Sequence, residues 1–174
     1  MTLILSNKYN PLFTSDARYF IITGGRGSGK SFAVTVFLTL LTMAKGIRIL
    51  FTRLTMTSAH LSIIPEFLEK ISLLGFDNVF SINKAEVLNQ SNSSDILFRG
   101  IKTSAGNQTA SLKSLQGIST WVLDEAEELV DEDIFDTIDL SIREKNIQNR
   151  IILILNPVTK EHWIHNRFFE AKGV

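Results

Sequence analysis

A glycine-rich run from Gly24 to Ser31 (GGRGSGKS) has residue types and spacing suited to binding phosphate groups. It matches the pattern G-x-x-x-x-G-K-S, in which glycines let backbone N–H groups face a bound anion without a Cβ clash. In such a loop the ammonium group of Lys30 reaches the β- and γ-phosphates of a nucleoside triphosphate, and the hydroxyl group of Ser31 binds Mg²⁺. The predicted nucleotide site consists of Gly24, Gly25, Arg26, Gly27, Ser28, Gly29, Lys30 and Ser31.

Arg26 places a second cation inside this loop. A guanidinium group is well shaped for a forked contact with phosphate oxygens, so Arg26 is a candidate for contact with the γ-phosphate and for catalysis. The alternative is a solvated arginine that bonds loop carbonyl groups. Both interpretations stay open at this point.

Two carboxylates, Asp124 and Glu125, directly follow the apolar run Thr120–Leu123. In P-loop hydrolases an aspartate in this position holds Mg²⁺, and the following glutamate orients or deprotonates the attacking water. The alternative is the acidic start of a helix, since acidic residues are common there and several more follow. The apolar strand that runs straight into the pair favours the functional interpretation.

The elements that must position these residues alternate between apolar strands and helical patterns, which predicts an α/β fold around a mainly parallel sheet. Strands are expected at 19–23, 47–52, 120–123 and 150–155. Helices are expected at 32–44, 58–74, 131–143 and 159–169, with Pro65 marking a first turn or a kink. The short runs within 79–98 predict a small antiparallel addition, and the polar stretch 102–116 a mobile loop or a short helix.

Length and composition set further limits. The 174 residues are 44% apolar, enough for one domain with a hydrophobic core. Eighteen basic and eighteen acidic residues cancel, so any basic surface must be local. There is no cysteine, which excludes disulfides and thiolate metal sites, and no apolar run long enough to cross a membrane. These features predict a soluble, cytosolic protein with no membrane partner.

Four segments together resemble one family, the large terminase subunit of tailed bacteriophages. They are the loop GGRGSGKS, the stretch Leu112–Trp121 followed by VLDEAEEL, the strand end Ile154–Pro157, and Thr159–Trp163 with Arg167–Phe169 after it. The phosphate loop alone is common to many families, and the ordered set is much more specific. The match is to the N-terminal ATPase domain of that family, which has the ASCE (RecA-like) form of the P-loop fold.

The resemblance implies ATP hydrolysis, with Mg²⁺, that powers the movement of double-stranded DNA into a procapsid. The catalytic residues would be Glu125, Lys30 and Arg26, and Ser31 with Asp124 would hold the metal. Asn156 would sense the γ-phosphate, although an Asn-Pro turn at a strand end is the structural alternative. The implied partners are DNA, a portal protein and a small terminase subunit, in a homo-oligomeric ring, in the host cytoplasm and transiently on the procapsid. Large terminases continue into a nuclease domain, and we expect residues 1–174 to be a single ATPase domain without it.

Several residues carry weaker predictions. Arg143 is a second candidate for an arginine that acts on a neighbouring subunit, or it caps its helix. Candidates for DNA contact are Arg53, His60, Arg99, Lys102 and Lys113, although for any single one of them an ordinary solvated side chain is the favoured interpretation. Candidates for the adenine pocket are Tyr9, Pro11 and Phe13, with plain packing as the alternative.

Other functions share the phosphate loop. A kinase is disfavoured because the sequence indicates no acceptor pocket. A GTPase is disfavoured because there is no Asn-Lys-x-Asp guanine motif, which the stretch 83–86 only approaches. A helicase-like enzyme, or a nucleotide-dependent scaffold that is inactive in isolation, remains an alternative.

Overall fold

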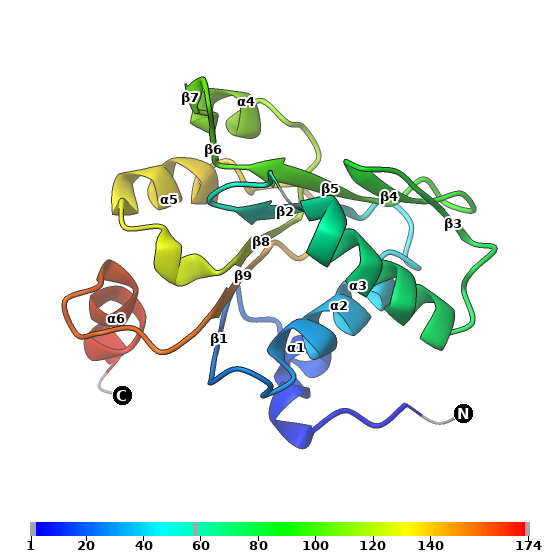
Figure 1. The fold of residues 1–174 in the computed structure, drawn as a ribbon, viewed down its shortest axis with the longest axis horizontal. Helices are drawn as coiled ribbons and strands as arrows, with labels where there is room; N and C mark the ends of the chain where they lie inside the picture. The colour runs from blue at the N-terminus through cyan, green and yellow to red at the C-terminus, as the bar shows by residue number, and fades with distance from the viewer. Residues whose placement is uncertain (1–2, 58, 173–174) are drawn as a thin grey trace.

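A seven-stranded sheet lies between two groups of helices in the computed structural model, which describes residues 3–57 and 59–172 (Figure 1). The strands in sheet order are β1 (Tyr19–Thr23), β9 (Arg150–Leu155), β8 (Thr120–Asp124), β2 (Arg48–Arg53), β5 (Asp95–Gly100), β4 (Glu86–Asn89) and β3 (Phe80–Ile82). The strands from β1 to β5 in this order are parallel, β4 is antiparallel to β5, and β3 is antiparallel to β4. The predicted fold class and its small antiparallel addition are therefore confirmed.

The position of β9 decides which residues meet. β9 pairs with β1 on one side and with β8 on the other. Thr23 lies opposite Leu155, and Asp124 lies opposite Ile154. Because parallel strands end at the same edge of a sheet, the residues that follow β1, β9 and β8 emerge side by side. A strand between the P-loop strand and the acidic strand is the defining feature of the ASCE class.

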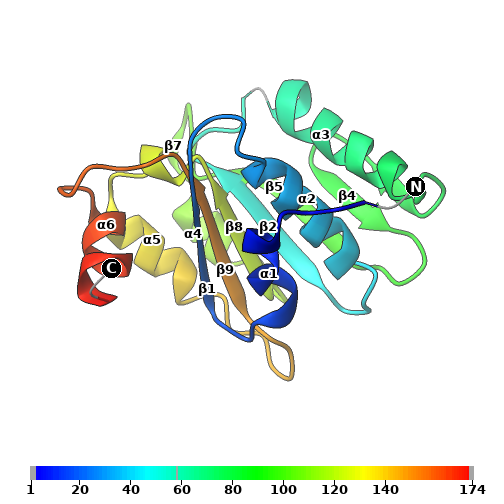
Figure 2. The ribbon, with the colours of Figure 1, turned by 90° about the horizontal axis from the view of Figure 1, so that it is seen from below.

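Helices cover both faces of the sheet, as a parallel sheet with two apolar faces requires. The elements outside the main sheet are η1 (Asn7–Tyr9), α1 (Pro11–Thr14), α2 (Lys30–Leu41), α3 (Ala59–Leu73), β6 (Lys102–Thr103), β7 (Gly106–Asn107), α4 (Thr109–Lys113), η2 (Ala126–Glu128), α5 (Glu132–Asp139), α6 (Trp163–Phe168) and η3 (Glu170–Lys172). One buried cluster joins α1, α2 and α3 to the sheet, and a second joins α4, α5 and α6 to the opposite face. Figure 2 shows α1–α3 on one side of the sheet and α5 and α6 on the other. No helix in the described part of the chain is long and apolar enough to cross a membrane.

Some helix ends differ from the sequence-based expectation. The first turn of α2 is made by Lys30 and Ser31, so this helix begins inside the phosphate loop. It ends at Leu41, where the side-chain amides of Asn89 and Asn92 both donate to the carbonyl group of Thr42 at 3.0 Å. These side chains satisfy a carbonyl group that the helix leaves unpaired, so the helix stops before Ala44.

The later helices are also shorter than expected. His162 caps α6 because its side chain accepts from Ile164 N, so the helix starts there and not at Thr159. Helix α5 ends at Asp139, before Arg143, which therefore does not cap it. Pro65 lies in the second turn of α3, and the expected helix start at residue 58 is outside the described residues.

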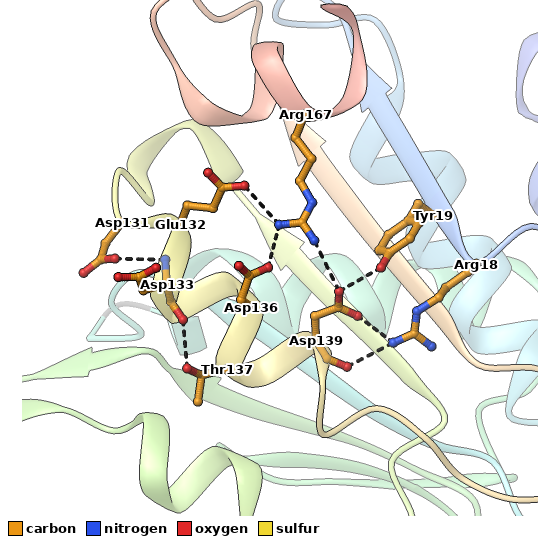
Figure 3. Close-up of polar contacts among 9 residues, drawn as sticks. All are labelled: Arg18, Tyr19, Asp131, Glu132, Asp133, Asp136, Thr137, Asp139 and Arg167. Atoms are coloured by element: carbon orange, nitrogen blue, oxygen red, sulfur yellow. Dashed lines mark hydrogen bonds and ion pairs between the residues drawn. The ribbon is translucent and has the colours of Figure 1, made fainter. Parts of the chain in front are cut away.

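A buried carboxylate ties α5 to the start of β1 (Figure 3). Asp139 is 5% exposed, and its Oδ1 accepts from Arg18 Nη2 at 2.5 Å while its Oδ2 accepts from Tyr19 OH at 2.8 Å. Arg18 also donates to the backbone carbonyls of Asp139 and Ile142. The carboxylate is thus compensated by one cation and one hydroxyl group, as a buried charge requires.

Arg167 of α6 extends this network to the exposed side of α5 (Figure 3). Its Nη1 contacts Glu132 Oε1 at 3.0 Å and Asp136 Oδ1 at 2.5 Å, and its Nη2 lies 3.8 Å from Asp139 Oδ2. The guanidinium also lies 5.0 Å from the ring centre of Phe135. Exposed pairs contribute roughly 0–1 kcal/mol each, so their main effect is to fix the orientation of α6 against α5.

Candidate functional site

A cleft of about 370 Å³ opens at the carboxyl ends of the central strands. It brings together the phosphate loop after β1, the end of β8, the residue that follows β9 and the last residue of β2. Its polar lining outside the loop consists of Arg53, Asp124, Glu125, Glu127 and Asn156. In α/β sheets such a cleft beyond the strand ends is the usual place for a ligand.

The phosphate loop has the backbone that its glycines predict. Gly29 has φ +80° and precedes the first turn of α2, a left-handed conformation that favours glycine. A Cβ on Gly24 would lie 3.0 Å from Ser28 Oγ, too close without a shift. Lys30 Nζ donates to the carbonyl groups of Gly24 and of Gly25, the latter at 3.0 Å. The ammonium group therefore lies within the curve of the loop, where it is placed to meet phosphate oxygens.

The N-terminal segment holds this loop from outside the cleft. Tyr9 OH donates to Ser28 O at 2.9 Å, and Lys8 Nζ donates to the same oxygen at 3.1 Å. Tyr9 and Pro11 also line a second cleft, of about 400 Å³, along β1. Phe13 is not among its lining residues and packs against Phe37 with ring centres 5.1 Å apart. The adenine pocket stays a prediction for Tyr9 and Pro11, and the structure favours packing for Phe13.

Asp124 is held by an arginine from the neighbouring strand. Its side chain is 7% exposed, and Arg53 Nε and Nη2 both contact Asp124 Oδ2, at 2.8 and 2.7 Å. Both contacts fall on one oxygen, so Asp124 Oδ1 accepts no hydrogen bond from the described residues. The sequence makes Arg53 a candidate for DNA contact or a solvated side chain. It lies instead in the cleft with its side chain 21% exposed, because the last residue of β2 is adjacent to the end of β8.

Glu125 has an unusual backbone conformation for a residue with a side chain. Its φ and ψ are 53° and 45°, in the left-handed region, which is uncommon outside glycine and costs roughly 1 kcal/mol or more. Strain of this kind is concentrated at functional sites. The side chain is 44% exposed and its Oε2 lies 3.6 Å from Arg53 Nε. Burial raises the pKa of this carboxyl group, the charge of Arg53 lowers it, and the charge of Asp124 raises it again, with a net upward shift.

Asn156 follows β9 and turns its amide toward the acidic segment. Asn156 Nδ2 donates to Glu127 Oε1 at 2.6 Å. The sequence places Glu127 among the acidic residues of a helix start, but it belongs to the one-turn helix η2, which brings it into the cleft. Sequence reasoning misses its role in the site. The one sequence signal that could have indicated this role is the position of Glu127 two residues after Glu125, in the short 3₁₀ turn that follows β8.

Arg26 is exposed at the mouth of the cleft and donates no hydrogen bond to the described residues. It does not bond loop carbonyl groups, which was the alternative. Arg143 lies at the opposite edge of the sheet, where it lines a shallow depression with Lys113 and Gly117. Lys102 begins β6 shortly after β5, and Lys113 ends α4. The side chain of His60 lies outside the described part of the chain.

The donor set of the cleft fits a triphosphate with Mg²⁺. The loop offers backbone N–H groups and the ammonium group of Lys30 for anionic oxygens. For a hard cation the cleft offers one hydroxyl oxygen, from Ser31, and one carboxylate oxygen, Asp124 Oδ1. The described residues contain no cluster of three or more acidic, His or Cys ligands, and a metal that is held mainly by substrate phosphates and water needs none.

Comparison with known proteins agrees with this geometry. The family model described as "Phage terminase large subunit" matches residues 16–173. No curated protein sequence matches the chain significantly. Among solved structures, the large terminase of a thermophilic bacteriophage superposes with a TM-score of 0.75 and 12% identity over 98% of this chain and 44% of its own. The same terminase has also been solved in complex with ADP.

Two further structures give similar results. The large terminase of bacteriophage HK97 has a TM-score of 0.73 and 11% identity over 98% of this chain and 37% of its own. The bacteriophage Phi-29 genome packaging motor assembly has a TM-score of 0.66 and 14% identity over 97% of this chain and 51% of the matched chain. The chain thus spans less than half the length of the thermophilic-phage and HK97 terminases, and the low identities make these matches evidence for the fold. With a family model that covers almost its whole length, the chain belongs to the phage terminase large subunit family.

Proposed function

We propose that this chain hydrolyses ATP to ADP and phosphate, and that the hydrolysis drives the movement of double-stranded viral DNA into a procapsid. The observation that carries the proposal is the meeting of the phosphate loop, Asp124 with Glu125, and Asn156 in one cleft at the ends of three adjacent strands. Family membership supports the motor role, as does the likeness to the packaging assembly of Phi-29.

The chemistry follows from the positions of the side chains. The loop N–H groups and Lys30 bind the β- and γ-phosphates and offset the negative charge that develops in the transition state. Glu125 accepts a proton from the attacking water, and its raised pKa makes it a stronger base than an exposed glutamate. Arg26, which donates no hydrogen bond to the residues that the structure describes, stabilises the γ-phosphoryl oxygens, and Asn156 senses their presence. Mg²⁺, held by Ser31 and Asp124, would neutralise phosphate charge.

The wider setting is also part of the proposal. The partners are double-stranded DNA, a portal protein and a small terminase subunit, in a homo-oligomeric ring, in the host cytoplasm and transiently on the procapsid. Lys102, the first residue of β6, is a candidate for contact with DNA phosphates. The β6–β7 hairpin to which it belongs protrudes from the sheet (Figure 1).

The test is ATP hydrolysis by the purified chain, measured as phosphate release with and without double-stranded DNA. Wild-type protein is expected to turn over only with Mg²⁺. Glu125→Gln should bind ATP and lose turnover by a factor of roughly 10² or more, whereas Lys30→Ala should lose both. Wild-type turnover in Glu125→Gln would refute the assignment. ATP binding without turnover, even when DNA and the other motor subunits are added, would favour a nucleotide-dependent scaffold.

A further inference from the structure

The side chain of Asn156 can present either of two chemically opposite groups to the cleft. Its Oδ1 only accepts hydrogen bonds, and its Nδ2 has two N–H groups that only donate. Phosphate oxygens are acceptors, so contact with a γ-phosphate requires that an N–H group be available. Something must therefore fix which end of the amide faces the cleft.

The contact with Glu127 selects one end. An ionised carboxylate has no hydrogen to donate, so Glu127 can pair only with the Nδ2 end of the amide. The 2.6 Å distance between Asn156 Nδ2 and Glu127 Oε1 is short, as expected of a hydrogen bond to a charged acceptor. One N–H group is used in this bond. The second makes no bond to any residue that the structure describes.

Glu127 is itself held from behind. Its backbone carbonyl accepts from His162 Nε2 at 3.1 Å, and His162 Nδ1 accepts from Ile164 N, so Nε2 must carry the hydrogen. Nearby, Trp163 Nε1 donates to Leu129 O at 2.5 Å. The backbone of the segment that contains Glu127 is thus attached to the start of α6 at two points.

The second carboxylate oxygen is not explained by the fold. Glu127 Oε2 is inaccessible to solvent and has no hydrogen-bond partner among the described residues. A buried acceptor without a partner is costly, so a purely structural role would favour an apolar residue here. A charged carboxylate at position 127 is explained if Asn156 needs a hydrogen-bond partner that can only accept.

We propose that Glu127 is a positioning residue that holds the Asn156 amide with its nitrogen toward the phosphates, so that the second N–H group is presented to the γ-phosphate. This inference rests on the proposed function of the cleft as an ATP site. Glu127 does not contact the phosphate, which a carboxylate would repel. Its effect passes through Asn156 and appears as discrimination between nucleotides with and without a γ-phosphate.

The experiment measures the dissociation constants of ATPγS and ADP, each with Mg²⁺, by competition against a fluorescent nucleotide. Asn156→Ala and Glu127→Ala should each reduce the preference for ATPγS over ADP by about tenfold, the size of one hydrogen bond to a charged group. ADP affinity and the thermal unfolding midpoint should change little. The double variant should lose no more than either single variant, because both remove the same contact.

Two further variants separate positioning from structure. Glu127→Gln keeps the shape, and its amide can pair with either end of Asn156, so an intermediate loss is expected even if Glu127→Ala fails to fold. Glu128→Ala removes the neighbouring exposed carboxylate and should behave as wild type. An unchanged nucleotide preference in Glu127→Gln, additive losses in the double variant, or no loss in Asn156→Ala would each overturn the inference while leaving the ATP site intact. Failure of the wild-type chain to bind either nucleotide would instead overturn the proposed function, and this inference with it.

Discussion

Replacing Arg53 by methionine should destabilise the nucleotide-free protein and make it depend on Mg²⁺ and nucleotide for stability. Methionine keeps much of the apolar stem but removes the guanidinium group that pairs with Asp124. The Asp124 side chain is 7% exposed. Without Arg53 its carboxylate is a buried charge that has no hydrogen-bond or ion-pair partner among the described residues. Removing one member of a buried pair costs roughly 3–5 kcal/mol.

The Arg53 side chain is 21% exposed, which lets some water reach the pair and reduces the expected loss to about 2–3 kcal/mol. For a chain of this length each kcal/mol lowers the unfolding midpoint by roughly 2–4 °C, so we expect a fall of about 5–10 °C. Mg²⁺ with ATPγS would supply a new positive charge next to Asp124. The rise in midpoint on adding ligand should therefore be larger in Arg53→Met than in wild type.

Differential scanning fluorimetry with and without Mg²⁺-ATPγS provides the measurement, and Arg48→Met is the matched control. Arg48 pairs with Asp95, another carboxylate that is 7% exposed, outside the nucleotide cleft. Arg48→Met should lower the midpoint without any extra gain from ligand. If both variants respond to ligand as wild type does, the idea that Arg53 substitutes for a cation at Asp124 is wrong.

Three other substitutions test separate parts of the structure. Burial raises the pKa of Glu125, so the folded protein favours the protonated carboxyl group. The protonated group contributes to the stability of the fold below the pKa of the unfolded chain, and this contribution is lost as the pH rises through the pKa of the folded protein. Glu125→Gln should thus raise the thermal unfolding midpoint at pH 7 relative to wild type, and this difference should vanish near pH 4; a difference that grows on acidification would contradict the reasoning. In wild type, the loss of turnover at low pH should be centred above the ordinary glutamate pKa of 4.5. Asp139→Ala should cost about 1–2 kcal/mol in urea unfolding, since the 36% exposed Arg18 side chain loses its carboxylate partner, with unchanged nucleotide affinity. Reduced affinity would mean that this network reaches the cleft. Trp163→Phe should cost about 1–3 kcal/mol because Leu129 O loses its donor, and an unchanged urea midpoint would show that the bond contributes nothing.

Features that depend on neighbouring residues in the chain could be predicted from the sequence. The phosphate loop and the strand ends at Thr23 and Leu155 are set by glycine spacing and by apolar runs, and the structure agrees with both. The burial of Ile134 and Ile138 on one side of α5 follows in the same way from helical spacing.

Features that depend on sheet order could not be predicted in the same way. Nothing near Arg53 in the sequence indicates that β2 would lie beside β8 and bring its last residue onto Asp124. The contact between Glu127 and Asn156 spans 29 positions and exists because β9 is inserted next to β8. The expected end of α2 is wrong for a similar reason, since the side chain of Asn89, far along the chain, caps this helix.

β9 is the last strand of the sheet to be synthesised, although it lies between β1 and β8, and this order affects how the nascent chain can fold. β1 and β8 are made before β9, and because β9 lies between them in the sheet they do not pair with each other. A nascent chain that ends before Arg150 therefore has its phosphate loop and its acidic pair without the strand that joins them. Such non-local closure is slow and leaves apolar strand edges exposed meanwhile. Nucleotide capture should thus become possible only after β9 has left the ribosome, and a nascent chain that has released β8 but not β9 should need chaperone protection.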